Sequence, residues 1–86
     1  MIIKKELIKR DIAGDTILVP VGKTVYESNG LFALNEVAAF IWDILPRVET
    51  AEEICEAVLA EYEVSPEEAA RDVAEFLNRL KRMDLI

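Results

Sequence analysis

Apolar and polar positions divide the chain into a front half rich in short apolar runs and a back half with helical periodicity. Residues 3–12 mix apolar residues with charges and predict a strand, and residues 13–15 (Ala-Gly-Asp) are a turn signal. The run 16–21 predicts a second strand. Because proline donates no ladder hydrogen bond, Pro20 indicates that this strand lies at a sheet edge or carries a bulge.

The end of the front half is expected to form the third strand of an antiparallel sheet. Residues 22–26 lead to Asn29-Gly30, a pair that favours positive φ and closes tight hairpins. The apolar run 31–34 follows and predicts the last strand.

The first predicted helix is short and apolar on nearly every side. Asn35 is a good N-cap, the helix continues to about Leu45, and Pro46 ends it. A helix without a polar face is expected to be central and buried on several sides.

Two capping boxes predict two more helices joined by a short turn. Thr50 with Glu53 begins a helix that runs to about Tyr62, and Ser65, followed by proline at the first helical position, begins one that runs to about Met83. The apolar stripe of the first comprises Ala51, Ile54, Cys55, Val58 and Tyr62, and that of the second comprises Ala69, Val73, Phe76, Leu77 and Leu80. The terminal Leu85 and Ile86 are expected to pack back on the body.

These elements predict an α+β fold, winged helix-turn-helix-like, with an N-terminal antiparallel three-stranded β-sheet followed by a three-helix bundle. With 86 residues, the chain is expected to form one domain over 1–86, too small for a deep cavity walled on all sides. It shows no signal peptide and no apolar run near the ~20 residues that span a bilayer, so a cytoplasmic location is expected.

The charge is concentrated in the back half. The net charge is −7, and residues 36–86 hold thirteen acidic and five basic residues. No basic residue lies between Arg47 and Arg71. Such a stretch is ordinarily a solvated acidic face; the alternative is attraction to a basic partner surface.

Catalytic and metal-binding chemistry lacks its residues. The chain has no histidine and one cysteine, Cys55, which lies on an apolar stripe where a thiol behaves as a small hydrophobe. A zinc site needs clustered Cys and His, and a nucleophile needs a neighbouring base. We therefore expect no enzyme activity, no metal and no cofactor.

The helix-turn-helix suggests DNA binding, but the charges disfavour it. The last helix opens with Glu67-Glu68, and the helix before it has no basic residue, whereas duplex binding neutralises several phosphates with Lys or Arg. A winged-helix transcription regulator remains the alternative function, and a small structural subunit of a larger enzyme is a third. No nucleic-acid or membrane partner is expected.

A strand edge beside an apolar helix can bind an extended peptide. The peptide adds a strand, its backbone hydrogen bonds supply affinity, and pockets for alternate side chains supply specificity. The strand over 31–34 and the stripe of the last helix are the candidates. The exposed edge also allows a homodimer in which the β-rich N-termini exchange.

Three segments of the chain form a recognisable set. They are LNEVA at 34–38 with Ile41-Trp42, TAEEI at 50–54, and the ending formed by Asp72-Val73, Phe76-Leu77, Leu80 and Leu85-Ile86. In their order and spacing, these segments resemble the PqqD-like family, also described as RiPP recognition elements. The resemblance covers about residues 15–86. It departs at Asp84, where the family usually has glycine, and this puts the local C-terminal turn in doubt.

The resemblance implies a peptide chaperone in the biosynthesis of ribosomally made, post-translationally modified peptides. Such a protein binds the leader of a precursor peptide and presents it to a modifying enzyme, typically a radical S-adenosylmethionine enzyme of SPASM type with auxiliary iron–sulfur clusters. It also implies that the leader lies as an added strand beside the third strand, against the last helix.

By position, the peptide-binding residues would be Leu31, Phe32, Ala33, Leu34, Arg71, Val73, Phe76, Leu77, Arg79 and Leu80. We expect apolar leader side chains to insert against the helix stripe, with Arg79 or Arg71 at the rim meeting acidic leader residues. Leu34 and Leu80 could instead belong to the core. Helical spacing puts Phe76 and Arg79 at one border of the stripe and Ala70, Ala74 and Lys81 at the other; the Phe76 border is favoured because a large side chain can anchor a ligand.

Overall fold

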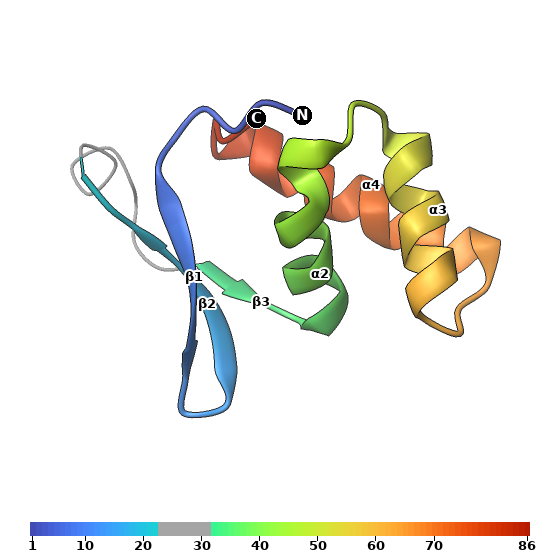
Figure 1. Cartoon of the computed structure of the whole chain (residues 1–86), viewed down its shortest axis with the longest axis horizontal. Helices are drawn as coiled ribbons and strands as arrows, with labels where there is room; N and C mark the ends of the chain where they lie inside the picture. Colours follow the sequence, from blue (N-terminus) through green and yellow to red (C-terminus); the bar gives the residue numbers. More distant parts are fainter. Residues whose placement is uncertain (23–31) are drawn as a thin grey trace.

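The computed structural model describes residues 1–22 and 32–86 and has a three-stranded sheet followed by helices (Figure 1). The strands β1 (Leu7–Ile12), β2 (Asp15–Pro20) and β3 (Phe32–Leu34) are antiparallel neighbours in the order β1-β2-β3. The helices are α2 (Glu36–Ile44), the 3-10 turn η1 (Leu45–Arg47), α3 (Ala51–Glu61) and α4 (Pro66–Arg82). The predicted α+β, winged helix-turn-helix-like class is confirmed.

The β1–β2 hairpin closes through a tight turn. Its register runs without a break from Leu7↔Pro20 to Ile12↔Asp15. The two turn residues, Ala13 and Gly14, have φ of 52° and 86°, as the mirror-image turns of two-residue hairpins require.

The first strand begins at Leu7 rather than at residue 3, because the preceding segment is bonded elsewhere. The Lys4 backbone amide donates to the Leu85 carbonyl at 2.7 Å. The N-terminal ammonium donates to the carbonyl oxygens of Leu45 and Val48. The N-terminus therefore lies against the helices, near the C-terminus (Figure 1).

The prediction that the second strand lies at an edge or carries a bulge is wrong. β2 is the central strand, and its pairing with β1 is regular up to Pro20. Pro20 is tolerated because it is the last residue of β2, and the described pairing with β3 ends at Leu18↔Phe32. The expected turn at Asn29-Gly30, the segment 24–26 and Leu31 lie outside the described residues.

Each helix begins with the cap that the sequence predicts. Side-chain oxygens of Asn35, Thr50 and Ser65 accept hydrogen bonds from backbone amides three residues later, at 2.8, 3.3 and 3.1 Å. One end differs from the prediction: α2 stops at Ile44 and the chain continues through Pro46 as η1. Proline is compatible with this position because the first turn of a helix does not need its amide.

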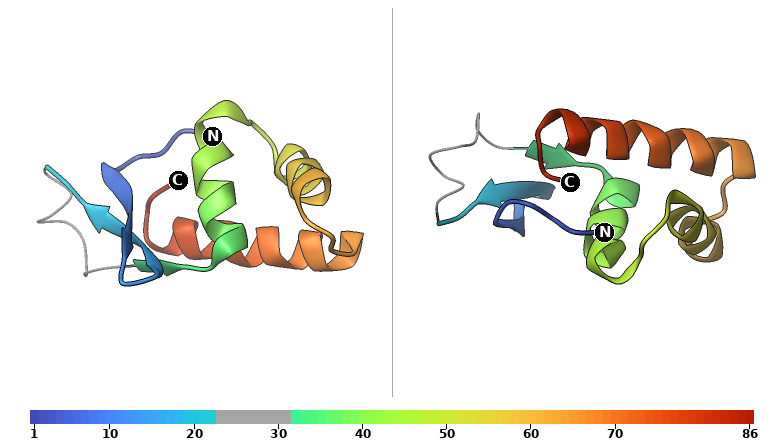
Figure 2. Two further views of the ribbon diagram at one scale, coloured as in Figure 1. Left: turned by 60° about the horizontal axis from the view of Figure 1, so that its bottom comes forward. Right: turned by 90° about the horizontal axis from the view of Figure 1, so that it is seen from above.

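The core lies where α2 meets the sheet and α4. α2 stands between the sheet and α3, and α4 runs behind both helices (Figures 1 and 2). The buried residues are Leu18, Phe32 and Leu34 of the sheet; Ala38, Ile41, Trp42 and Leu45; Ile54 and Val58 of α3; Ala69, Val73, Phe76, Leu77 and Leu80 of α4; and Leu85. The predicted central position of the first helix is thus confirmed.

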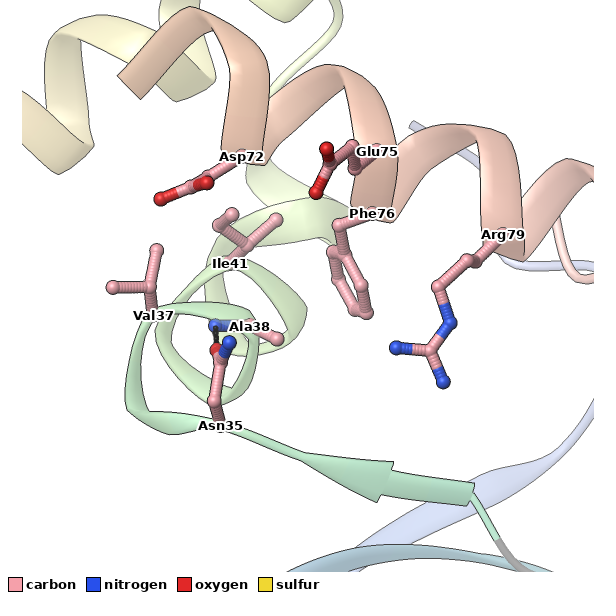
Figure 3. Close-up of a pocket in the computed structure, with 8 residues that line it drawn as sticks. All are labelled: Asn35, Val37, Ala38, Ile41, Asp72, Glu75, Phe76 and Arg79. Carbon is pink, nitrogen blue, oxygen red and sulfur yellow. Dashed lines mark hydrogen bonds between the residues drawn. The ribbon is translucent and has the colours of Figure 1, made fainter. Parts of the chain in front are cut away.

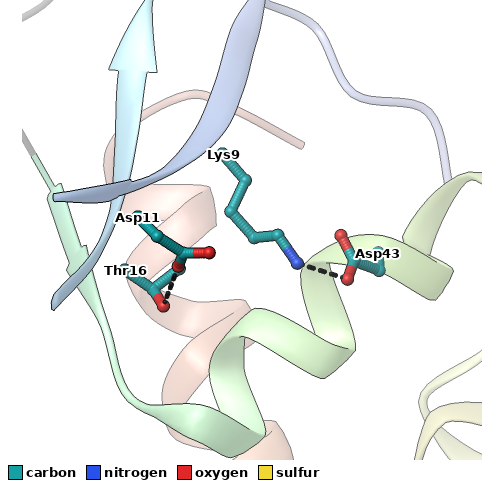
Figure 4. A network of polar contacts seen from close by, with 4 residues as sticks. All are labelled: Lys9, Asp11, Thr16 and Asp43. Atoms are coloured by element: carbon teal, nitrogen blue, oxygen red, sulfur yellow. Dashed lines mark hydrogen bonds and ion pairs between the residues drawn. The ribbon is translucent and has the colours of Figure 1, made fainter. Parts of the chain in front are cut away.

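Polar contacts also hold the β1–β2 hairpin in place (Figure 4). The ion pair between Lys9 of β1 and Asp43 of α2 links the hairpin to this helix. Across the hairpin, the Thr16 hydroxyl donates a hydrogen bond to the Asp11 carboxylate.

The C-terminal turn forms although glycine is absent from it. The amides of Asp84 and Leu85 donate to the carbonyls of Lys81 and Leu80 at 3.0 and 2.9 Å, which is the Schellman pattern. Asp84 takes the left-handed position with φ of 57°. Leu85 is buried against the core, as expected.

Candidate functional site

β3 is an edge strand of the sheet and lies beside α4. Within the described residues it pairs with β2 alone, so its other edge carries no strand. Phe32 and Leu34 are buried, whereas Ala33 points away from the core and is exposed. An unpaired strand edge is a template for another extended chain.

Aromatic contacts close the seam between β3 and α4. The rings of Phe32 and Phe76 are parallel, with centroids 6.3 Å apart, and both are at most 5% exposed. The Arg79 guanidinium carbon lies 4.1 Å from the Phe32 ring centroid, a cation–π distance. The seam therefore has an apolar floor and a cationic rim.

A small cavity of about 90 Å³ opens at one end of this seam, between the start of α2 and α4 (Figure 3). α2 lines it with the apolar residues Val37, Ala38 and Ile41, and α4 places Asp72 and Glu75 at its border. Cavities that hold a benzene ring measure roughly 150 Å³, so this one suits an aliphatic side chain better than an aromatic one.

A second hollow lies at the other end of the seam and is lined by Phe32, Arg79, Arg82 and Met83. Arg79 borders both hollows. We refer to the two together as the β3–α4 groove. It runs alongside β3, so a strand added to the free edge would lie in it.

The structure separates the predicted site residues into three groups. Phe32, Phe76 and Arg79 come together in the groove. Leu34, Val73, Leu77 and Leu80 are buried in the core. Ala33 and Arg71 are exposed, and the Arg71 Nε lies 3.9 Å from the carboxylate of Asp72, which borders the cavity. Leu31 lies outside the described residues.

The two borders of the α4 stripe face different elements. Phe76 and Arg79 face β3. Ala70 and Ala74 instead line a hollow shared with Ala51 and Cys55 of α3. The Phe76 border is therefore the one beside the free strand edge.

Sequence reasoning missed the residues that α2 and the polar side of α4 contribute. Val37, Ala38 and Ile41 were assigned only to the packing of a central helix, yet they form one wall of the cavity. Asp72 and Glu75 precede Phe76 and Arg79 with spacing i, i+3, i+4, i+7. That spacing could have shown that they share one face of the helix.

The described part of the chain offers a binding surface and little reactive chemistry. It contains no group of three or more Cys, His, Asp or Glu side chains placed to hold a metal ion. Burial raises the pKa of the Tyr62 phenol, with Glu36 and Glu61 adding to the rise. Cys55 is half-buried and packs against the core.

Within residues 1–22 and 32–86, no helix combines the length and apolar character that crossing a membrane requires.

Comparison with protein families gives a match over most of the chain. The family model "Coenzyme PQQ synthesis protein D (PqqD)" matches residues 16–86. None of the curated proteins matches the chain.

Two solved structures share the fold. The structure of TbiB1 in complex with the TbiA(beta) leader peptide has a TM-score of 0.72 and 29% sequence identity, covering 99% of this chain and 93% of that one. The structure of lasso peptide synthetase B1 complexed with the leader peptide has a TM-score of 0.68 and 24% identity, covering 93% and 88%. At 24% identity, the likeness to lasso peptide synthetase B1 concerns the fold alone.

Proposed function

Because the chain belongs to the PqqD family, we propose that it binds the leader segment of a ribosomally synthesised precursor peptide and presents it to a modifying enzyme. Proteins of this family are non-catalytic peptide-binding chaperones. The observation that carries the proposal is the edge of β3 beside α4, which pairs with no strand among residues 1–22 and 32–86, with Phe32, Phe76 and Arg79 in the groove between them.

The leader binds as an antiparallel strand on β3. Backbone hydrogen bonds to the edge supply affinity, and every second leader side chain faces α4. The TbiB1 structure, which is in complex with a leader peptide and covers 99% of this chain with the same fold, supports the binding of a leader peptide.

Burial changes which residues the leader contacts. Val73, Phe76, Leu77 and Leu80 are each at most 5% exposed, so they support the groove from beneath. The surfaces left to the leader are Ala33, the Arg79 side chain and the cavity beside the half-buried Val37, with the fully buried Ile41 beneath it. An apolar leader side chain enters that cavity, and Arg79 meets an acidic one.

The modifying enzyme supplies the chemistry. Since proteins of this family are non-catalytic, the modification takes place on the partner, for which we propose a radical S-adenosylmethionine enzyme of SPASM type. The chaperone contributes affinity and alignment of the leader, which raises the effective concentration of the substrate at the enzyme.

The test is an NMR titration of labelled protein with the leader peptide encoded beside its gene. Amide shifts should concentrate in 32–38 and 69–82. Leader peptides N-methylated at alternate positions provide a second readout. N-methylation removes the hydrogen-bond donor of a backbone amide, and only alternate amides of an added strand face β3. Methylation of the amides that face β3 should therefore weaken binding at least tenfold, whereas methylation of the other amides should have little effect.

Two cationic residues of α4 provide a matched pair. Arg79→Ala should weaken leader binding about three- to tenfold, because it removes a charge beside the bound strand. Lys81→Ala removes a positive charge at an exposed position outside the groove and should leave affinity unchanged. Shifts confined to α3, or equal effects of the two variants, would contradict the proposed site.

A further inference from the structure

Charges of opposite sign occupy opposite ends of the β3–α4 groove. Asp72 and Glu75 border only the cavity at the α2 end, Arg82 borders only the hollow at the Phe32 end, and Arg79 lies between them and borders both. The separation follows from helix geometry, because these four residues lie in sequence order along one side of α4.

Most of these charges form no ion pair with the described residues, although the Arg82 Nε donates to the Asn78 carbonyl at 3.4 Å. Among residues 1–22 and 32–86, Glu75, Arg79 and Arg82 take part in no ion pair. Asp72 has only a long contact with Arg71, at 3.9 Å. The Arg79 guanidinium lies over the Phe32 ring, which holds its position without neutralising its charge.

The direction of β3 determines the order in which a bound peptide meets the acidic and basic groove residues. β3 runs from Phe32, which contacts Arg79, to Leu34, which precedes the cavity residue Asn35. A strand added antiparallel to β3 runs the opposite way. Its N-terminal part meets Asp72 and Glu75, and its C-terminal part meets the arginines.

The spacing of the charges sets the separation within the peptide. Glu75 and Arg79 are about 6 Å apart along the helix axis, and Asp72 and Arg82 are about 15 Å apart. Side chains on one face of a strand repeat every two residues, about 6.7 Å. Two to four peptide residues therefore span the distance from acidic to basic groove charges.

We propose that the β3–α4 groove selects leaders by charge order: a basic residue, then an acidic residue two to four positions closer to the C-terminus on the same face. The inference rests on the proposed strand addition and specifies the substrate class for that site. The charge order also fixes the register of the leader on β3. A slip of two residues would separate the basic leader residue from the acidic groove residues and the acidic leader residue from the arginines.

The test is selection from a random peptide library displayed on phage against the immobilised full chain. Enriched peptides should carry Lys or Arg on the N-terminal side and Asp or Glu on the C-terminal side of a shared apolar residue. Synthetic peptides that differ only by exchange of these two charges should differ about three- to tenfold in affinity, since exposed ion pairs contribute modestly. The difference should shrink at about 0.5 M salt.

Protein variants identify the groove charges as the cause. The double variant Glu75→Lys with Arg79→Glu should invert the enriched order. The matched double variant Glu52→Lys with Lys81→Glu, which makes the same exchange at exposed positions outside the groove, should preserve it. Arg79→Gln, a milder change, should remove only the acidic preference and guards against loss of folding in the double variant.

The outcomes separate this inference from the proposed function. Enriched peptides without a charge order, or an order unchanged by the groove double variant, would overturn the charge selection and leave strand addition standing. Absence of any enrichment over bare support would overturn both.

Discussion

At the scale of single residues, Asp84 holds a backbone conformation that glycine adopts more easily. Its φ of 57° completes the Schellman turn that returns Leu85 to the core. Aspartate tolerates the left-handed region better than most residues, and Lys4 contacts its carboxylate at 3.2 Å. Both side chains of that ion pair are more than half exposed, so it contributes little to stability.

Two substitutions at Asp84 isolate the backbone cost. Asp84→Gly and Asp84→Ala both remove the ion pair, but only glycine relieves the left-handed strain. We expect the glycine variant to be about 1 kcal/mol more stable than the alanine variant in urea unfolding, although glycine is the weaker residue in ordinary helical positions. An alanine variant of equal or higher stability would contradict the described turn.

At the scale of elements, local signals predict more than long-range ones. The caps at Asn35, Thr50 and Ser65 depend on residues three positions apart, and the α4 stripe depends on helical spacing, so the sequence contains both. The start of β1 depends on a bond between Lys4 and Leu85, which are distant in sequence.

The groove was predicted incompletely for the same reason. The sequence indicates a strand edge and an apolar helix, but which border of α4 faces β3 depends on how the helices pack. The sequence predicts Phe76 as a ligand anchor, but in the structure its ring packs against the parallel ring of Phe32. Likewise, the role of Ile41 as a cavity wall follows from the crossing of α2 and α4.

The cap at Asn35 joins β3 to α2 and offers an element-scale prediction. Its side chain accepts from the half-buried Ala38 amide at 2.8 Å. Asn35→Ala should lower the free energy of unfolding by about 1 kcal/mol, because that amide loses its acceptor. Asn35→Asp keeps an acceptor at the helix start and should stay within about 0.5 kcal/mol of the parent. Equal destabilisation by both variants would show that the cap is not the source.

At the scale of the whole molecule, the distribution of charge favours a peptide partner over a nucleic-acid partner. The net charge is −7, and the turn between α3 and α4 is flanked by acidic residues. α4, the position of a recognition helix in winged helix-turn-helix proteins, begins with exposed Glu67 and Glu68. Near its other end, Arg79 and Arg82 line the groove, where they can contact a bound strand.

We therefore expect no binding of duplex DNA at about 0.15 M salt in a fluorescence anisotropy titration with micromolar protein. Phosphates approaching α4 would meet Glu67 and Glu68 before any arginine, and the field of the back half repels them. The charge-reversed variant Glu67→Lys with Glu68→Lys tests the cause, because weak salt-sensitive binding that emerges only in this variant identifies the acidic helix start as the barrier. Binding by the parent chain that weakens steeply with added salt would contradict the expectation, because release of counterions from neutralised phosphates produces that dependence.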